Sequence, residues 1–287
     1  MAIAAFDIGG TSVKYGLWNG TDLKRKGSFP TPKTWDEMRA GFKRVFEEFT
    51  ADEEVTGAGF SFPGSVDMDK GAIFGLSAVP YIHRFPIRDE LEQELGVPVK
   101  MENDANSAAL AELWRGAATE VKNALFVVVG TGVGGAVIVN RQIVRGMNLF
   151  GGEFGCMLLD DSTPLSMVGT PFQAANRYTE KSGETIDGKE LFDRAERGDE
   201  LAQHEVEVFQ NALAQGIHNL LVCFNPELLV VGGAISVRKD FLEQLTGKVN
   251  GLLQKTGSTD VEARIVPCTF HNDANLIGAV SKFELEP

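Results

Sequence analysis

A single carboxylate, Asp7, stands at the end of the first apolar run of the sequence and is followed by Ile-Gly-Gly-Thr. A tight hairpin needs the glycines but not the acid, so Asp7 is either a turn residue or part of a site. Glycines after a strand also let backbone N–H groups approach phosphate oxygens without a Cβ in the way. Residues 7–11 are therefore a candidate phosphate loop.

A second glycine-rich turn, Gly-Thr-Gly-Val-Gly-Gly, occupies residues 130–135 after another apolar run. It is not a dinucleotide fingerprint, because we expect a strand after it instead of a helix and no acid closes the adjacent strand. It is not a Walker loop, because no Gly-Lys-Ser/Thr follows. Either turn alone fits a plain hairpin. Two such turns, one with an acid, favour a nucleotide whose phosphates are held between two domains.

The predicted elements place both turns between strands. Strands are expected at 2–8 and 15–20, at 55–62 before the Pro63-Gly64 loop, and at 97–104. Helices are expected at 34–49, where Thr34 and Glu37 form a capping box, at 87–95, closed by Gly96, and at 105–116. The second half repeats the opening strand–turn–strand pattern over 123–146. A long helix over about 199–224, strands at 227–236 and 263–268, and a helix at 272–283 follow. The alternation of strands and helices predicts an α/β fold with a duplicated module.

Composition narrows the functions further. The chain of 287 residues is 43% hydrophobic and 23% charged, which is typical of a globular protein with room for two domains. A net charge of −13 argues against a nucleic-acid partner. We find no run of about 18 apolar residues and no N-terminal leader, so we expect no membrane association and a cytoplasmic location. The three scattered cysteines and four scattered histidines indicate reduced thiols and no Cys/His metal cage.

Six segments carry a specific resemblance over almost the whole chain: FDIGGT, FPGSVD, ENDAN, GTGVGG, GGEFG and LLVVGGAIS. In this order they are similar to the ROK family of bacterial sugar kinases and sugar-responsive repressors. The resemblance implies a two-lobed actin/hexokinase (ribonuclease H-like) fold with a duplicated mixed sheet, and ATP and sugar in a cleft between the lobes. The lobes expected are a small N-terminal one, 1–107 plus 272–287, and a larger C-terminal one, 108–271. A homodimer is also expected from the family.

The resemblance also implies which residues bind the acceptor sugar. In kinases of this kind the aspartate matching Asp104 takes the proton from the attacking sugar hydroxyl, and a carboxylate there also orients that hydroxyl. The alternative role for Asp104 is a helix N-cap. Gly64, Asn103, Asp104 and Glu153 resemble the family's sugar contacts. Carboxylates and amides suit paired ring hydroxyls.

The resemblance likewise implies which residues bind ATP. Beside a polyphosphate Asp7 would be repulsive without a cation, so the resemblance implies that it engages Mg²⁺, directly or through water. The other residues that match the ATP-binding positions are Gly9, Gly10, Thr11, Thr131, Gly132, Gly134, Gly232 and Gly233. Lys14 is either a further charge near the phosphates or a solvated strand lysine.

Two departures from the family pattern concern the sugar. Most members have a Gly-His after the sugar-binding glutamate and then a cysteine-rich zinc segment, whereas this chain has Cys156 at the histidine position and no cysteine cluster. We therefore expect no zinc. The usual Asn-Leu after the first Pro-Gly loop is replaced by SAVPYIHRFP. Both changes affect the anomeric side of the sugar by analogy and are similar to a zinc-less branch that contains beta-glucoside kinases.

The substrate expected is O6 of glucose or of a β-glucoside, because a site without polar groups for a free 1-hydroxyl tolerates a substituent there. Tyr81 or Phe154 would then stack on a second ring, unless they are packing residues. Phosphorylation of N-acetylmannosamine is the alternative. A non-catalytic sugar sensor or ROK-type regulator is a further alternative, which the retained Asp104 and the absence of a helix-turn-helix disfavour.

Overall fold

The computed structural model describes residues 2–285 of the chain, which divides into two compact units. The first unit contains the chain up to Gly116, the segment Gly146–Phe150, and the chain from Asn272 onward. The second contains Ala117–Arg145 and Gly151–His271. We expected the first segment to end at residue 107. It continues to Gly116 because the helix that ends at Arg115 packs against strands and the last helix of the first unit.

The first unit is built on a five-stranded mixed sheet with the order β3-β2-β1-β4-β7. The strands are β1 (Ala2–Ile8), β2 (Ser12–Trp18), β3 (Leu23–Pro30), β4 (Val55–Phe62) and β7 (Val99–Asn103). β1, β2 and β3 pair antiparallel, whereas β1, β4 and β7 pair parallel. A short hairpin of β5 (Ser65–Asp67) and β6 (Ala72–Phe74) follows β4.

The helices of the first unit are α1 (Trp35–Thr50), α2 (Ile87–Leu95), α3 (Asp104–Arg115) and α9 (Ala274–Leu285). Thr34 caps α1 by accepting a hydrogen bond from the amide of Glu37, and Gly96 ends α2 with a φ of 70°. Both ends are as the sequence predicts. The chain also forms short 3-10 helices at η1 (Pro80–Ile82), η2 (Phe154–Cys156), η3 (Ala234–Val237) and η4 (His271–Asp273).

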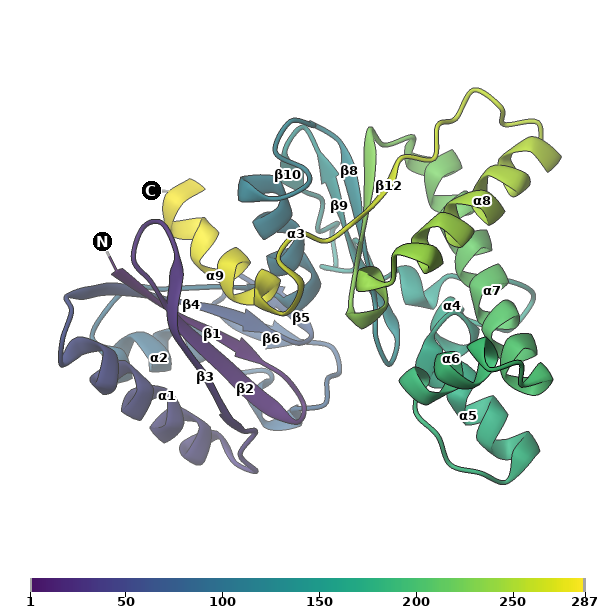
Figure 1. Cartoon of the computed structure of the whole chain (residues 1–287). Helices are drawn as coiled ribbons and strands as arrows, with labels where there is room; N and C mark the ends of the chain where they lie inside the picture. Colours follow the sequence, from purple (N-terminus) through teal and green to yellow (C-terminus); the bar gives the residue numbers. More distant parts are fainter. Residues whose placement is uncertain (1, 286–287) are drawn as a thin grey trace. The chain divides into compact units, whose positions relative to one another are not determined.

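Side chains alternate along β1 and so meet different helices. Phe6 and Ile8 belong to the core that includes α1 and α2. Ile3 and Ala5 belong to a cluster with residues of α9. Figure 1 shows α1 and α2 on one side of this sheet and α9 on the other. Asp7 has the parity of Ile3 and Ala5, and its carboxylate therefore faces α9.

Helices α3 and α9 approach each other too closely for a side chain at the crossing. A Cβ placed on Gly278 of α9 would lie 1.6 Å from the carbonyl oxygen of Ser107 in α3. Glycine is therefore required at this position. The close packing keeps α3 in the first unit up to its C-terminal end.

The second unit repeats the sheet topology, with the order β10-β9-β8-β11-β12. Its strands are β8 (Ala124–Val129), β9 (Val133–Val139), β10 (Gln142–Ile143), β11 (Leu228–Gly232) and β12 (Ile265–Pro267). β8, β9 and β10 pair antiparallel, and β8, β11 and β12 pair parallel. The predicted duplication of the strand–turn–strand module is thus confirmed in the strand pairing.

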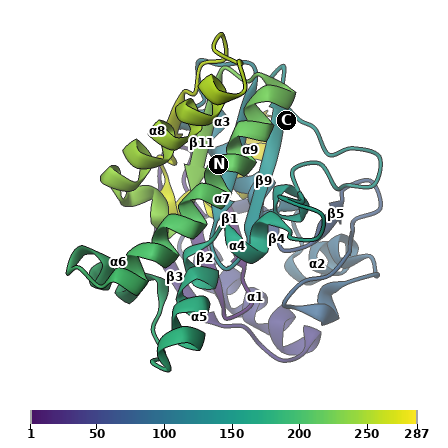
Figure 2. The same ribbon diagram turned by 90° about the vertical axis from the view of Figure 1, so that its right-hand side faces the viewer.

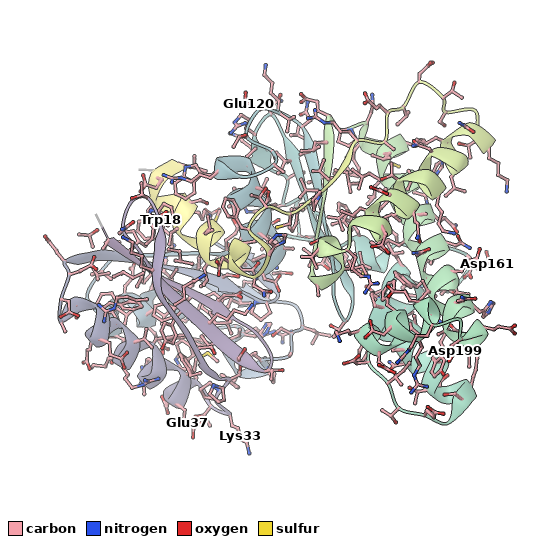
Figure 3. All side chains as sticks on the ribbon, in the orientation of Figure 1. Trp18, Lys33, Glu37, Glu120, Asp161 and Asp199 are labelled. Atoms are coloured by element: carbon pink, nitrogen blue, oxygen red, sulfur yellow. The ribbon has the colours of Figure 1, made fainter. Side chains whose placement is uncertain are left out.

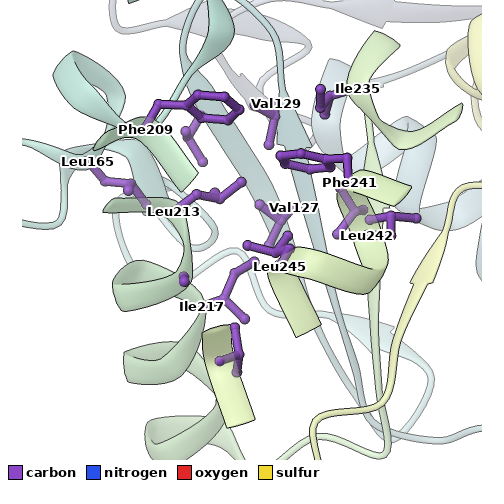
Figure 4. Close-up of a cluster of buried hydrophobic side chains, with 14 of the residues drawn as sticks. Val127, Val129, Leu165, Phe209, Leu213, Ile217, Ile235, Phe241, Leu242 and Leu245 are labelled. Atoms are coloured by element: carbon purple, nitrogen blue, oxygen red, sulfur yellow. The ribbon is translucent and has the colours of Figure 1, made fainter. Parts of the chain in front are cut away.

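The helices of the second unit are α4 (Leu165–Val168), α5 (Pro171–Ser182), α6 (Gly188–Glu196), α7 (Glu200–Phe224) and α8 (Lys239–Lys255). α7 and α8 pack on the sheet (Figure 2). Figure 4 shows Ile217 of α7 and Leu245 of α8 in the same apolar cluster as Val127 of β8. Asp199, labelled in Figure 3, caps α7 by accepting a hydrogen bond from the amide of Ala202.

Candidate active site

A row of polar residues crosses the first sheet where its parallel strands end. Asp7 of β1 is in register with Ser61 of β4, and Ser61 is in register with Glu102 of β7. All three are buried. Ligands of open α/β sheets bind beyond the carboxyl ends of the strands, so this row lies directly behind a candidate binding surface.

Asp7 is held at the start of the row by hydrogen bonds. Its Oδ1 accepts from the hydroxyl of Ser61 and from the side-chain amide of Asn275 in α9, both at 2.9 Å. Lys14, its register partner in β2, places Nζ 3.9 Å from Oδ2. Burial raises the pKa of the Asp7 carboxyl, and Asn275, Lys14 and Ser61 act in the opposite direction. A bound cation would favour the charged form, which fits the role expected from the sequence.

The loop Gly9–Thr11 offers backbone groups at the surface. Gly10 and Thr11 are exposed, and Gly9 closes the turn by donating its N–H to the carbonyl of Ser12 at 3.0 Å. Thr31 of the following connection donates its hydroxyl to the Gly9 carbonyl at 2.6 Å. The loop is thus fixed by its neighbours while its tip faces solvent. This arrangement suits the binding of a phosphate group.

Asp104 is the first residue of α3, and Asn103, not Asp104, is the N-cap. The side chain of Asn103 accepts from the amide of Asn106 at 3.1 Å. Oδ1 of Asp104 accepts from the amide of Ala105 at 2.8 Å and from Nδ2 of Asn103 at 2.9 Å. The alternative role of Asp104 as a cap is therefore wrong. Its carboxylate is held in one orientation and is partly exposed.

Gly64 lies next to this pair. Its carbonyl accepts from Nδ2 of Asn103 at 3.0 Å, and its φ of 98° requires glycine. The structure thus brings Gly64, Asn103 and Asp104 together, as the sequence predicts for sugar contacts. Asp7 and the Gly9–Thr11 loop belong to the same unit.

The turn at 130–135 in the second unit is fixed by a serine. Oγ of Ser166 in α4 accepts from the amide of Val133 at 2.9 Å. The amide of Gly130 donates to the carbonyl of Gly132 at 2.9 Å, while Thr131 is exposed and Gly134 half-exposed. The turn therefore resembles the Gly9–Thr11 loop in having a fixed backbone and an accessible tip.

Two glycines at the end of β11, the last strand residue Gly232 and the next residue Gly233, are needed by the packing of the sheet. A Cβ on Gly232 would lie 2.8 Å from the ring of Phe126. Gly233 has a φ of 89°, and a Cβ there would lie 2.1 Å from the carbonyl oxygen of Val129. Close approach to the neighbouring strand thus accounts for both residues. Their expected role near adenosine stays a prediction.

Glu153 lies in the second unit, directly before η2. The residue is exposed overall, but partial burial of its carboxyl raises its pKa. Phe154 is buried, and a Cβ on Gly135 would lie 2.3 Å from its ring. Tyr81 packs against the core of the first unit and donates its hydroxyl to the carbonyl of Pro32. Phe154 is therefore a packing residue, and the contacts of the half-buried Tyr81 favour the same one of the two alternatives left open by the sequence.

Within residues 2–285 no three or more His, Cys, Asp and Glu side chains are grouped so as to hold a metal ion. No disulfide joins the three cysteines. Over the same described range, none of the helices has the length and apolar character needed to span a bilayer.

Comparison with known proteins identifies the family. The model of the ROK family matches residues 3–284. The chain belongs to the ROK family. A beta-glucoside kinase of Klebsiella pneumoniae is 34% identical over 295 residues, covering 99% of this chain and 96% of that protein.

Two solved structures are also similar over nearly their full length. A ROK family protein from Streptococcus pneumoniae TIGR4, in complex with sucrose, has a TM-score of 0.91 and 34% identity. The alignment covers 100% of this chain and 99% of that chain. A putative N-acetylmannosamine kinase from Listeria monocytogenes has a TM-score of 0.90 and 32% identity, with the same coverage of 100% and 99%. The predicted actin/hexokinase fold with two mixed sheets is confirmed.

Three residues of this ROK protein's candidate site were missed by the sequence analysis: Ser61, Ser166 and Asn275. For Asn275 the sequence holds a signal, because Asn-Asp-Ala-Asn occurs twice, at 103–106 and at 272–275. The last asparagine of each copy donates to a buried carboxylate. Asn106 binds Glu102 at 3.3 Å, and Asn275 binds Asp7 at 2.9 Å.

Glu153 provides a test through pH. Because its pKa is raised, the folded state holds the proton more tightly than the unfolded chain does, so this residue lowers stability as pH rises from about 4.5 through the raised pKa. Glu153→Gln should therefore gain stability relative to the wild type as pH rises, and should bind sugar more weakly. Urea unfolding at several pH values and sugar titration measure the two effects. A stability difference that is constant with pH would contradict the expectation.

Proposed function

We propose that this protein transfers the γ-phosphoryl group of ATP to O6 of glucose or of a β-glucoside. At the broader level the chain is an ATP-dependent carbohydrate kinase. The observation that carries the choice of sugar is the 34% identity to a beta-glucoside kinase over 99% of this chain. The chemistry needs an alcohol brought in line with a phosphoryl group, a base for its proton and groups that hold the phosphates.

Asp104 is the base in this proposal. Its two hydrogen bonds to Oδ1 fix the plane of the carboxylate, so that it can both orient a hydroxyl and take its proton. Asn103 and Gly64 adjoin it and contact the sugar, and Glu153 is a further sugar contact from the second unit. The fixed positions of Asn103 and Gly64 favour this role, since they limit the entropy lost on binding.

The phosphates of ATP bind the backbone of Gly9, Gly10 and Thr11 and that of Thr131, Gly132 and Gly134, with Gly232 and Gly233 near the adenosine. Asp7 fits a magnesium site of the kind that keeps several waters and needs one carboxylate besides the phosphates. The buried carboxylate of Asp7 contacts an amide and a hydroxyl, and the Nζ of Lys14 lies 3.9 Å away. Bound there, Mg²⁺ would neutralise charge on the phosphates.

A missing polar group gives further support to a sugar with a substituted anomeric carbon. Cys156 occupies the position where most family members have a sugar-contacting histidine, and a site without that partner does not penalise a substituted anomeric carbon. N-acetylmannosamine is the second candidate, supported by the similarity to a putative N-acetylmannosamine kinase.

A sugar panel tests the function. Release of ADP is measured with glucose, cellobiose, N-acetylglucosamine and N-acetylmannosamine, and NMR of the product identifies the phosphorylated oxygen. We expect turnover with glucose or cellobiose and phosphate on O6. Preference for N-acetylmannosamine would select the second candidate. The absence of ATP-dependent turnover on every sugar tested would favour a sensor over a kinase.

We further propose a cytoplasmic homodimer without zinc. The support is the similarity to the family and the absence of the cysteine-rich segment from the sequence. Light scattering of the purified protein measures its mass. Elemental analysis tests the metal content, and zinc in a stoichiometric amount would refute that part of the proposal.

A further inference from the structure

The first turn of α9 contacts the buried carboxylate of Asp7, and the function proposed so far assigns this contact no role. Asn275, the second residue of α9, donates its side-chain amide to Oδ1 of Asp7 at 2.9 Å. An ionised carboxylate only accepts hydrogen bonds, so the NH₂ end of the amide must face it. Both residues belong to the first unit, and the contact exists only because α9 lies on its sheet.

Close packing against β4 fixes the position of α9. A Cβ on Gly57 would lie 2.6 Å from the ring of Phe283, and a Cβ on Gly59 would lie 2.4 Å from the carbonyl oxygen of Ala279. The two glycines therefore let the helix lie closer to the strand than side chains at these positions would allow. Gly57, Gly59 and Ser61 alternate along β4 and so face the same side of the sheet.

The spacing of helix and strand extends this contact to Asn275. Four residues of an α-helix rise about 6 Å, and two residues of a strand rise about 6.6 Å, so the two elements stay in step. The contacts of the two glycines are one such step apart, and the next step reaches Asn275 of α9 and Ser61 of β4. Both donate to the same oxygen, Oδ1 of Asp7, at 2.9 Å. The packing of α9 on β4 thus determines where the amide lies.

The two oxygens of Asp7 have different surroundings. Oδ1 accepts both hydrogen bonds, whereas Nζ of Lys14 lies 3.9 Å from Oδ2, which is too far for a hydrogen bond. Across residues 2–285, no N–H or O–H group donates a hydrogen bond to Oδ2. Rotation of the carboxylate about its Cβ–Cγ bond would break both bonds to Oδ1. Asn275 and Ser61 therefore determine which oxygen stays available to a ligand.

An available oxygen on an oriented carboxylate suits the magnesium site proposed above. Mg²⁺ demands near-ideal octahedral geometry, and it takes one or two carboxylates besides waters and phosphate oxygens. A carboxylate with a fixed plane meets this demand without losing further freedom on binding. Removal of a hydrogen-bond partner that orients such a carboxylate typically lowers metal affinity by about 10- to 100-fold.

We propose that Asn275 is a positioning residue, which holds Oδ1 of Asp7 so that Oδ2 is available to Mg²⁺ or to a water bound to it, and thereby strengthens the binding of the Mg²⁺–nucleotide complex. This inference rests on the kinase function and the magnesium site proposed above. The competing explanation is a structural one, in which Asn275 only pairs a buried carboxylate and attaches α9 to the sheet. The two explanations differ in whether the effect of Asn275 on nucleotide binding depends on the metal.

Nucleotide binding with and without the metal tests the inference. The Kd of ADP is measured by calorimetry in excess Mg²⁺ and in EDTA, and the ratio of the EDTA value to the Mg²⁺ value gives the contribution of the metal. We expect Asn275→Ala to lower this ratio about tenfold, with the Kd in EDTA within about twofold of the wild type. Ser61→Ala removes the other donor to Oδ1 and should lower the ratio in the same direction. Asn272→Ala, at an exposed position of the same Asn-Asp-Ala-Asn segment, is the matched control and should leave the ratio unchanged.

The decisive comparison uses the double variant Asp7→Asn/Asn275→Ala. Because Asn275 acts through Asp7 in this inference, the double variant should have the same ratio as Asp7→Asn alone. A ratio in Asn275→Ala equal to that of the wild type would overturn the inference, even with a lower melting temperature, and would leave the kinase function intact. If Asn275→Ala does not fold, an unchanged ratio in Ser61→Ala has the same meaning. A wild type that binds no ADP under either condition and phosphorylates no sugar of the panel above would overturn the proposed function as well.

Discussion

Asp104→Asn is expected to lower kcat by about 10²- to 10⁴-fold, the usual contribution of a general base. The amide keeps an oxygen that can accept from Ala105 and Asn103, so the local structure and the sugar KM should change little. What is lost is the ability to take a proton. Steady-state kinetics with the best sugar of the panel, together with a melting curve, separate loss of catalysis from loss of structure.

The chain supplies a matched control in its second Asn-Asp-Ala-Asn segment. Asp273 has the same sequence neighbours as Asp104 and also lies at a helix start, directly before α9, but it pairs with Lys26 at 2.8 Å and is partly exposed. Asp273→Asn should leave kcat within about twofold of the wild type, because this carboxylate is not assigned a proton to move. If Asp104→Asn behaved like Asp273→Asn, the assignment of the base would be wrong.

Lys282→Met is expected to be the most destabilising of the substitutions considered. Nζ of Lys282 in α9 lies 3.2 Å from Oε2 of Glu102, and the two side chains are 4% and 1% exposed. Removing one partner of a buried ion pair typically costs about 3–5 kcal/mol, because a charge is left buried without its counter-ion. The melting temperature of the first unit should fall by roughly 6–20 °C. Calorimetry or circular dichroism measures it.

Two further variants make this prediction specific. Lys26→Met breaks a pair with a shorter distance, 2.8 Å, whose side chains are 51% and 36% exposed, and should cost about 0–1 kcal/mol. The double variant Glu102→Gln/Lys282→Met removes both charges and should recover part of the loss. Equal melting temperatures for Lys26→Met and Lys282→Met would show that burial of the pair does not matter.

The Glu102–Lys282 pair also bears on catalysis. Oε1 of Glu102 accepts from the amide of Asn103 at 3.0 Å and from Nδ2 of Asn106 at 3.3 Å. The pair thus supports the start of α3, where Asp104 lies. Some loss of kcat in Lys282→Met is therefore expected below its melting temperature, as misplacement of the base by a fraction of an ångström slows the reaction.

Much of the fold was predictable because local signals were strong. The α1 helix has a cap and five apolar residues at helical spacing, and α7 stops at Asn225 immediately before Pro226. The strands β1, β4, β8 and β11 are short apolar runs that end in glycine or serine turns. These elements depend on sequence patterns that act over a few residues.

Other elements carry weak local signals. β3 has the sequence LKRKGSFP, whose charged residues do not show the pattern of a strand. The strand is stabilised by its pairing with β2. α5 and α6 contain few apolar residues. Their positions are determined by contacts with distant residues in the core of the second unit. Most family members have a cysteine-rich segment after the glutamate that matches Glu153, whereas in this chain the corresponding residues lead into α4, whose Ser166 accepts a hydrogen bond from the 130–135 turn.

The residues of the candidate site also differ in how far the sequence alone reveals them. Asp7, Gly64 and Asp104 are recognisable from their motifs. Ser61 is not, since its relation to Asp7 exists only through the register of β1 with β4. Asn275 is 268 positions from Asp7 in the sequence, and only the packing of α9 on the sheet joins them.

The separation of Asp7 and Asn275 in the sequence has a consequence for the synthesis of the chain. The second unit uses residues up to His271, so all of its residues are synthesised before α9. A domain can fold as soon as its own residues have emerged. The carboxylate of Asp7, by contrast, stays without Asn275, and Glu102 without Lys282, until α9 arrives. The first unit, whose sheet is made first, is therefore completed only after the second unit has been synthesised.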